Sequence, residues 1–360
     1  MTIWANLTKT ETEYVPLGTF WSRSWDAPQD DVWAYVVGWD RLEFLRRTRY
    51  SVSTPAQNIN LKDLAEDVLI DAGLEASEYN IDPALASITV PWGWFDDQTH
   101  RECLRMIAEA CVGQVYCDRL GVIQIMGPLT FLASDLDLAI TSEHFERIKR
   151  PYRPGYAANS IKVNAHPLRT GALEELYRSE EITLAPGIGV YRVSFNTIPS
   201  INASASLENE LYSSIVDQEF YSWGAIITVE NIHASASDTF TLVLEGNPLT
   251  TPNKMPSIAQ DLDMVQEDGE AWYIFPHNHL VQNSSMAQDL ADSLLESYKQ
   301  DRLDVELDWR GNPALELGDV VELPDFEDIT TDKFEVVRQS LKYDGSLEAY
   351  LLGRRIIIGP

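Results

Sequence analysis

The sequence predicts a mixed β and α/β protein in which β-rich segments flank a small α/β unit. Short apolar runs rich in Trp, Tyr, Val and Ile alternate with turn-forming residues over 13–57 and 150–280, as in half-buried strands. Over 58–127 the apolar residues instead recur every three or four positions, which is the period of an amphipathic helix. A second helical stripe, followed by alternating strand patterns, occupies 283–360.

The N-terminal segment predicts strands. Apolar residues cluster over 15–21 and again over 32–39, and the aromatic side chains in both clusters favour a pleated surface. The segment 26–31, Asp-Ala-Pro-Gln-Asp-Asp, has turn-forming composition and is expected to connect the two runs. The segment 53–58 contains Pro55 and polar residues, so we expect it to be a linker to the next unit.

Two helices with their end signals are predicted in the α/β unit. The first has an apolar face over 61–69, with Asn60 placed to cap its start and Gly73 placed to end it. The second begins with a capping box made by Thr99 and Glu102. Its inner face is expected to hold Leu104, Ile107, Ala108 and Cys111, and Gly113 is expected to end it.

A hairpin is predicted after the second helix, because strand-forming runs on either side of Asp118 and Gly121 meet at turn chemistry. Further along, 287–298 carries a helical stripe, and Gly318 with Asp319 is expected to form a turn between strands. These patterns divide the chain into expected units at 1–57, 58–130, 131–282 and 283–360. The first holds strands, the second is the α/β unit, the third is β-rich, and the fourth joins a helix to strands.

The charge of the chain restricts the partners it can have. Among 360 residues, 27 Lys and Arg oppose 56 Asp and Glu, so the formal charge is 27 − 56 = −29. Such a surface repels phosphates, which disfavours tight nucleic-acid binding but suits a wall past which DNA slides. The start of the sequence lacks the pattern of a signal peptide, and no apolar run reaches the roughly 20 residues that span a bilayer.

The three cysteines, Cys103, Cys111 and Cys117, are expected to be free thiols of a protein made in a reducing cytosol. Cys103 and Cys111 share the second predicted helix at a spacing of about 12 Å, which is too long for a disulfide.

No set of residues assembles into a catalytic, metal or cofactor site. His277 and His279 form the one close histidine pair, and we interpret them as polar rings of a loop rather than metal ligands. The segment 91–97 holds Trp92, Trp94 and two acids, so a sugar platform is the alternative to aromatic packing over the second helix. We expect the packing role, and we expect no enzyme activity and no cofactor.

Three motifs, in this order, resemble the hub proteins of tailed-phage and prophage tail tips and baseplates. The first is Gly18-x-Phe20, Trp25-Asp-Ala-Pro and Val36-x-Gly-Trp-Asp40-Arg41-Leu42. The second is the helix over 61–74, Ile81-Asp82-x-x-Leu85, the capping-box helix and the Asp118/Gly121 hairpin. The third is the helix at Ala287, Asn312-Pro, Leu317-Gly318-Asp319-Val320 and the Asp344-Gly345 hairpin. Together they cover roughly 15–130 and 283–355.

The resemblance implies a homotrimeric ring with two tail-tube-like β-barrel domains per chain and a small α/β domain. It further implies docking to the tail tube or distal tail protein on one face and to a needle, spike or fibre protein on the other. Tape-measure protein and DNA in transit would pass through the channel. The implied location is the virion tail tip or baseplate, after assembly in the host cytoplasm.

The resemblance also predicts that the first barrel is truncated, or completed by a strand from a neighbouring chain, because only about fifteen residues precede its first motif. Two other classes of function stay open at this point: a tail-associated hydrolase of cell-wall glycan or peptide, and a carbohydrate-binding adhesive β protein. The structural and interface candidates are Trp25, Trp33, Trp39, Asp40, Arg41, Trp92, Trp94, Asp118, Gly121, Gly318 and Asp319.

Overall fold

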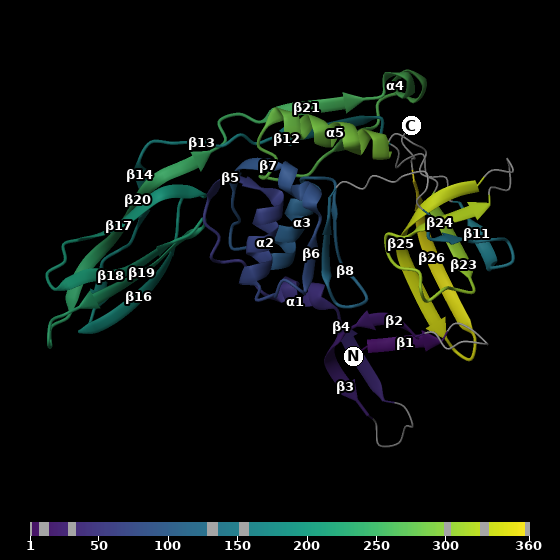
Figure 1. Cartoon of the computed structure of the whole chain (residues 1–360). Helices are drawn as coiled ribbons and strands as arrows, with labels where there is room; N and C mark the ends of the chain where they lie inside the picture. Colours follow the sequence, from purple (N-terminus) through teal and green to yellow (C-terminus); the bar gives the residue numbers. More distant parts are fainter. Residues whose placement is uncertain are drawn as a thin grey trace.

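The computed structural model describes residues 2–6, 14–27, 34–127, 136–150, 158–298, 304–324 and 331–356. It is mostly β, with a central α/β body from which β arms extend (Figure 1). One arm is a sandwich on the left of the view, another is a six-stranded sheet on the right, and the N-terminal strands lie below the body. Trp33 and Pro28 lie outside the described residues.

The central body is built from three helices and two small sheets. Its helices are α1 (Arg41–Arg47), α2 (Leu61–Asp71) and α3 (His100–Glu109), with a 3-10 turn at Pro83–Ser87. One sheet pairs β5 (Ala56–Asn60) with β7 (Thr89–Gly93), and the other has the order β6 (Tyr79–Ile81), β9 (Ile123–Met126), β8 (Gln114–Cys117).

The capping signals of the two predicted helices are confirmed. Asn60 Oδ1 accepts a 2.8 Å hydrogen bond from the backbone N–H of Asp63, and Thr99 Oγ1 accepts one of 3.2 Å from the N–H of Glu102. The carboxylate of Glu102 pairs with Arg105 rather than closing the capping box. The expected hairpin over Asp118 is also present, since β8 and β9 are antiparallel partners.

The main core extends beyond the predicted α/β unit. α5 (Ser284–Tyr298) packs on a three-stranded sheet of β21 (Met255–Gln260), β12 (Ser160–Ala165) and β22 (Trp272–Ile274), and the buried side chains of both join those of α2 and α3 in one cluster. The short α4 (Leu262–Asp268) lies at the end of this layer. The sequence grouped 283–298 with the C-terminal strands, but its apolar stripe is buried in the central core instead.

A β-sandwich over 169–250 forms the left arm in Figure 1. One layer centres on β20 (Asp238–Thr250), which pairs with β13 (Arg169–Thr170), β14 (Glu174–Arg178), β15 (Ile182–Leu184) and β17 (Ser200–Glu208). The other has the order β16 (Gly187–Ser194), β19 (Gly224–Asn231), β18 (Ser213–Phe220). Its own apolar cluster lies between the layers.

The right arm is a half-barrel of six strands. Their order is β10 (Leu138–Ala139), β24 (Val320–Pro324), β25 (Thr331–Tyr343), β26 (Leu347–Arg355), β23 (Asp304–Trp309) and β11 (Phe145–Lys149). The segment expected as one β-rich unit, 131–282, is therefore shared among three parts. Its start joins this half-barrel, its middle forms the sandwich, and β12, β21 and β22 join the core.

The N-terminal strands form two separate two-stranded sheets among the described residues. β1 (Thr2–Asn6) pairs with β2 (Tyr14–Thr19), and β3 (Trp21–Asp26) pairs with β4 (Tyr35–Trp39). The β3–β4 pair projects below the body in Figure 1. The expected linker over 53–58 was wrong, because 56–60 form β5 and Ser53 is buried, where its hydroxyl accepts a 2.9 Å hydrogen bond from the N–H of Phe95.

Replacing Leu104 with Ala is expected to lower the unfolding free energy by roughly 2–5 kcal/mol, because this side chain is fully buried in the main core. Chemical denaturation measures the change. Ile70→Ala is the matched control, since Ile70 lies on α2 with 58% of its surface exposed and should change stability little. Equal stability of Leu104→Ala and the unaltered chain would contradict the assigned core.

Candidate functional site

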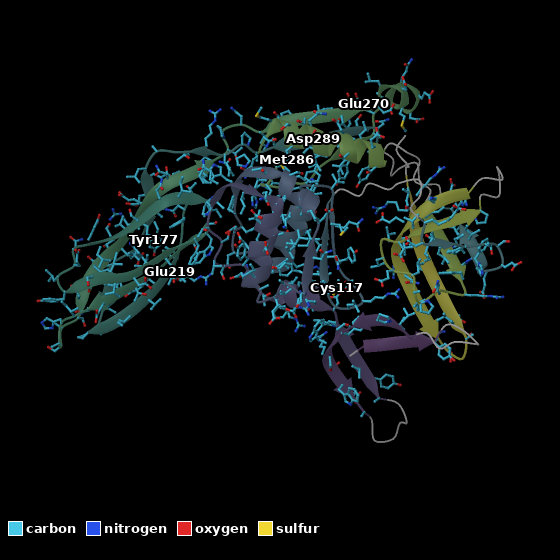
Figure 2. All side chains as sticks on the ribbon, in the orientation of Figure 1. Cys117, Tyr177, Glu219, Glu270, Met286 and Asp289 are labelled. Atoms are coloured by element: carbon cyan, nitrogen blue, oxygen red, sulfur yellow. The ribbon has the colours of Figure 1, made fainter. Side chains whose placement is uncertain are left out.

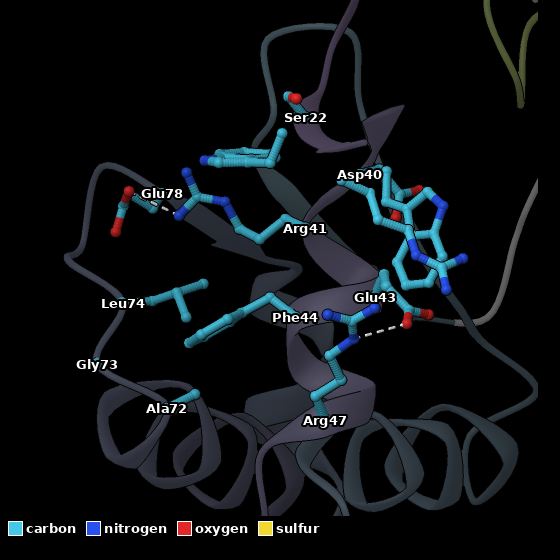
Figure 3. A pocket seen from close by; sticks show the side chains of 13 residues that line it. Ser22, Asp40, Arg41, Glu43, Phe44, Arg47, Ala72, Gly73, Leu74 and Glu78 are labelled. Atoms are coloured by element: carbon cyan, nitrogen blue, oxygen red, sulfur yellow. Dashed lines mark hydrogen bonds and ion pairs between the residues drawn. The ribbon is translucent and has the colours of Figure 1, made fainter. Parts of the chain in front are cut away.

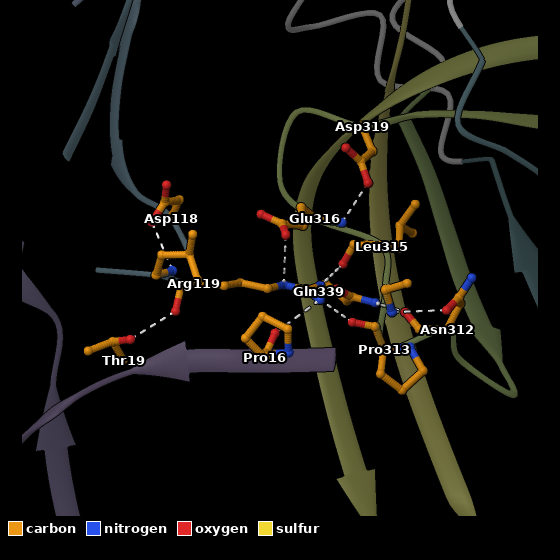
Figure 4. A network of polar contacts seen from close by, with 12 residues as sticks. Pro16, Thr19, Asp118, Arg119, Asn312, Pro313, Leu315, Glu316, Asp319 and Gln339 are labelled. Carbon is orange, nitrogen blue, oxygen red and sulfur yellow. Dashed lines mark hydrogen bonds and ion pairs between the residues drawn. The ribbon is translucent and has the colours of Figure 1, made fainter. Parts of the chain in front are cut away.

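Arg119 joins parts of the chain that are far apart in sequence (Figure 4). Its guanidinium donates hydrogen bonds to the carbonyl oxygens of Pro313 and Leu315, and a third, of 3.4 Å, to that of Pro16. The backbone carbonyl of Arg119 accepts a 3.0 Å hydrogen bond from Thr19 Oγ1. One side chain therefore ties the β8–β9 hairpin to the N-terminal strand β2 and to the segment before β24.

The β8–β9 turn holds Arg119 in place through Asp118. Asp118 Oδ1 accepts hydrogen bonds from the N–H groups of Leu120, at 2.9 Å, and Val122, at 2.8 Å. Gly121 supplies a backbone φ of +83°, which side-chain-bearing residues rarely adopt. An added Cβ at Gly121 would also lie 3.2 Å from Thr19. The turn chemistry expected of Asp118 and Gly121 is thus present, and it sets the Arg119 backbone beside β2.

The segment that receives the Arg119 hydrogen bonds is held by the turn at Gly318 and Asp319. Asp319 Oδ2 accepts a 2.6 Å hydrogen bond from the N–H of Glu316, and Gly318 has a φ of +89°. Arg119 Nε lies 3.6 Å from a carboxylate oxygen of Glu316. Burial raises the pKa of both Glu316 and Asp319, while the positive charge of Arg119 opposes this rise. The second and third sequence motifs therefore meet at Arg119.

The first motif lies around a pocket of about 500 Å³ between the β3–β4 pair and α1 (Figure 3). Trp39 ends β4, and the guanidinium groups of Arg23 and Arg47 each lie 4.3 Å from its ring centroid. Arg41, the first residue of α1, lies 5.0 Å above the ring of Trp21. The cation–π contacts of Arg41 and Arg47, which belong to α1, stabilise the attachment of an otherwise exposed hairpin.

Acidic residues complete the pocket. Arg41 forms a 2.6 Å ion pair with Glu78, and Glu43 is bonded to Arg46 and Arg47, so that hydrogen bonding to Arg46 holds the pKa of Glu43 at about 2. The side chain of Asp40 makes no capping hydrogen bond, although Asp40 is the residue before the helix. Arg41, one of the interface candidates, is thus paired within its own chain, to Glu78.

The β3–β4 pair itself is exposed. Trp25 has 67% of its surface in solvent and Tyr35 57%, although both belong to regular strands. A paired ribbon with a predominantly exposed aromatic surface is unusual for a monomeric soluble protein and is typical of an interaction surface.

The two sequence segments weighed as chemical sites lie against each other. Trp94 is buried and stacks on the ring of His279, with centroids 4.2 Å apart, and His279 Nε2 donates a 2.7 Å hydrogen bond to the Trp94 carbonyl oxygen. The backbone N–H and carbonyl of Trp92 both bond to the side chain of Gln282. Trp92 and Trp94 therefore join β7 to the segment before α5 and offer no open aromatic platform.

His277 has a partner that the sequence did not indicate. Its Nδ1 lies 3.0 Å from Nε2 of His166. Burial lowers the pKa of His166 and of His279 to about 4, and burial also lowers that of His277. Within the described ranges, no three His, Cys, Asp or Glu side chains are placed to hold a metal ion.

The sandwich is attached by a third polar contact. Trp223 Nε1 donates a 2.7 Å hydrogen bond to the carbonyl of Ser51, and the N–H of Ser222 donates one of equal length to that of Ser53. Arg192 stacks 4.1 Å over the Trp223 ring and forms a 3.1 Å ion pair with Asp97. The segment expected to be a linker is thus an attachment point.

Burial in the body raises the pKa of Cys103 and brings that of Cys111 to about 11, so both thiols are protonated at neutral pH. All three cysteines are free, Cys117 being half-buried.

Among the helices that the structure describes, none combines the length and apolar character of a membrane span.

Two solved structures have an architecture similar to that of this chain. No family model matches the chain, and no curated protein matches it. The tail protein of Neisseria meningitidis MC58 superposes with a TM-score of 0.56 at 10% identity, over 95% of this chain and 82% of that one. The 43 kDa tail protein of prophage MuSo2 from Shewanella oneidensis does so with a TM-score of 0.51 at 9% identity, over 98% and 88%.

The chain has the fold of phage tail proteins. The resemblance that the three motifs predicted is therefore confirmed at the level of the fold. The similarity covers 95% of this chain and is therefore not confined to the segments that carry the motifs. The chain is only 9–10% identical to these two tail proteins, so what it shares with them is the arrangement of the backbone.

Sequence reasoning missed the residues that make the contacts between parts. Arg119 and His166 each act on a partner far away along the chain, at Leu315 and His277 respectively. The position of Arg119 inside the predicted hairpin turn was the one available signal, because a long cationic side chain at a tight turn has few partners within its own hairpin.

Arg119→Ala is expected to lower the unfolding free energy by roughly 3 kcal/mol, about the value of one or two charge-assisted hydrogen bonds. It should also make the N-terminal strands cleavable by protease under native conditions. Denaturation and limited proteolysis measure both effects. Arg101→Ala is the control, because Arg101 is an exposed arginine on α3. Wild-type resistance to protease in Arg119→Ala would show that this contact does not hold the parts together.

Stability should fall as the pH is lowered from about 6.5 to about 4. The pKa of His166 and His279 is about 4 in the folded chain against 6.5 for an unperturbed histidine, so the unfolded state binds more protons in this window. Each histidine contributes a slope of up to roughly 1.4 kcal/mol per pH unit. The contribution is complete above pH 6.5.

Urea unfolding at several pH values measures this slope. His279→Gln keeps a donor for the Trp94 carbonyl but removes the titration, so its stability should depend less on pH. His144→Gln, at an exposed histidine, is the control and should keep the wild-type slope. A slope that His279→Gln leaves unchanged would contradict the assigned role of burial.

Proposed function

We propose that this chain is a structural component of a phage tail, and that it is the hub of the tail tip or baseplate. The observation that carries the proposal is the superposition of nearly the whole chain on tail proteins, since it extends over the body and each arm. The proposed role is non-enzymatic. The chain would act as a ring adaptor between the tail tube or distal tail protein and a needle, spike or fibre protein.

The arrangement of the arms supports an adaptor role. Polar and aromatic contacts at Arg119, Gln282 and Trp223 fix the N-terminal strands, the α5 layer and the sandwich to one body. A tail adaptor needs parts with fixed relative positions, and partly buried hydrogen bonds to backbone carbonyls supply that constraint. The half-barrel is the part that the proposal assigns to the tube-facing side.

The charge of the chain supports a place along the DNA path. With a formal charge of −29, the chain as a whole repels the DNA backbone, so a channel lined by its acidic residues would let DNA pass without adhering. The proposed assembly is a homotrimer formed in the host cytoplasm before it enters the virion tail.

Deleting the gene in its phage or prophage tests this proposal. We expect particles without complete tails, and tails should be restored by the gene supplied from a plasmid. Electron microscopy of negatively stained lysates, with antibody decoration of restored particles at the tail tip, is the measurement. Normal infectious tails in the deletion strain would refute the structural role.

A further inference from the structure

Two chain segments, here called the neck, connect the sandwich to the α5 layer. Residues 166–168 leave the end of β12 for the sandwich, and residues 251–254 return from β20 to the start of β21. The ladder between β12 and β21 ends at Ala165 and Met255, so His166 and Lys254 are the next positions on the two strands. In Figure 2, Tyr177 marks the sandwich on one side of the neck, and α5, with Met286 and Asp289, lies on the other.

A histidine pair ties the neck to the segment before α5. In this segment, His277 Nδ1 lies 3.0 Å from Nε2 of His166, with the two rings nearly perpendicular at 88°. The backbone N–H of His166 also donates a 2.7 Å hydrogen bond to the carbonyl of Val281. Two residues after His277, His279 stacks on Trp94 of the body. The neck, the α5 layer and the body therefore meet at three histidines.

The groups around these rings disfavour positive charge. Burial lowers the pKa of His166 and His279 to about 4 and lowers that of His277, and the neighbouring histidines and Lys254 lower it further. The carbonyl of Trp94 is the one group that favours a proton, on His279. None of the groups that shift these pKa values is a carboxylate, although the chain has 56 acidic residues. Protonation therefore collects positive charge at the neck with no acid to pair with it.

The bond between His166 and His277 needs one neutral ring. In the neutral pair, one facing nitrogen carries the proton and the other accepts it. A first added proton can go to a nitrogen outside the contact, so the bond remains. When both rings are protonated, both facing nitrogens are donors, so the hydrogen bond is lost and two cations face each other beside Lys254.

We propose that the neck is an acid-sensitive joint, in which protonation of both His166 and His277 separates the segment before α5 from the end of β12 and frees the sandwich to move. The hydrogen bonds of Trp223 and Ser222 to backbone carbonyls of the body involve no titratable group. The sandwich therefore stays attached there, and the expected movement is a pivot about this contact. The joint goes beyond the proposed function and does not depend on it.

The sign of the pH effect follows from where protons bind more tightly. A histidine of the open neck is in water, with a pKa of 6.5, whereas His166 in the closed neck has a pKa of about 4. The closed state is therefore favoured above pH 6.5 and loses this advantage as the pH falls towards 4. His166 alone should raise the ratio of open to closed neck about twentyfold between pH 7 and pH 5.

Hydrogen–deuterium exchange of the full chain, read by mass spectrometry and corrected for the intrinsic pH dependence of exchange, measures this opening. The reporting peptides contain the N–H groups of His166 and Phe275, which bond to Val281 and Lys162. Their protection should fall about twentyfold or more between pH 7 and pH 5. Peptides of β25 and β26 are the internal reference and should keep their protection, because the half-barrel has its own apolar cluster and 304–356 contain no histidine.

Substitutions of the exposed His277 separate an effect of charge from an effect of shape. His277→Lys places a permanent positive charge beside His166 and should lower the protection of the neck already at pH 7. His277→Glu places a carboxylate there, which pairs with protonated His166, so the neck should stay closed at pH 5.

A double variant removes the titration itself. His166→Gln with His277→Asn puts amide groups where the two facing nitrogens lie, and amides do not titrate, so the neck should lose its pH dependence. His144→Gln, at an exposed histidine of the half-barrel side, is the matched control and should behave as the unaltered chain.

Loss of protection that is confined to the neck, absent in the double variant and shifted in opposite directions by Lys and Glu supports the joint. Protection that is the same at pH 7 and pH 5 overturns it. A loss that the double variant retains, or that Lys and Glu change alike, also overturns it. An equal loss in β25 and β26 does so too, because it shows general unfolding by acid.

Discussion

The structure depends on one half-buried arginine, Arg119, at a hairpin turn. Arg119 donates to backbone carbonyls of the segment before β24, while its own carbonyl receives a bond from β2. Carbonyl oxygens are fixed by the backbone, so this contact sets the position of whole segments rather than of side chains. The guanidinium is well suited to it, because its planar fork holds several donors in a rigid geometry.

The contacts at Trp94 and His279 and at Trp223 are also hydrogen bonds to backbone carbonyls of another segment. Each joins an aromatic ring or amide of one part to a main-chain carbonyl of another, at a place where the chain is buried. The parts are therefore held together by directional bonds in addition to apolar packing. The ends of the molecule differ, since the β3–β4 pair and α4 leave apolar groups in solvent.

Local structure could be predicted from the sequence because it depends on neighbouring residues. The caps at Asn60 and Thr99 and the turn at Asp118 use partners within four positions, and all three are present. The assignment of segments to parts failed where it depended on distant contacts. The stripe on α5 is equally apolar whether it faces the half-barrel or the core, and periodicity does not distinguish the two.

In the candidate site too, the residues could be predicted from the sequence but their contacts could not. Trp25 and Trp39 could be singled out by composition, but their different roles depend on tertiary position: Trp25 is exposed, whereas the Trp39 ring contacts two arginines. A cryo-electron microscopy reconstruction of purified tails, detailed enough to trace chains, tests the central claim most directly. The account predicts this chain in a closed ring at the tail tip, each copy in contact with the next. A tail whose ring contains no copy of the chain would contradict it.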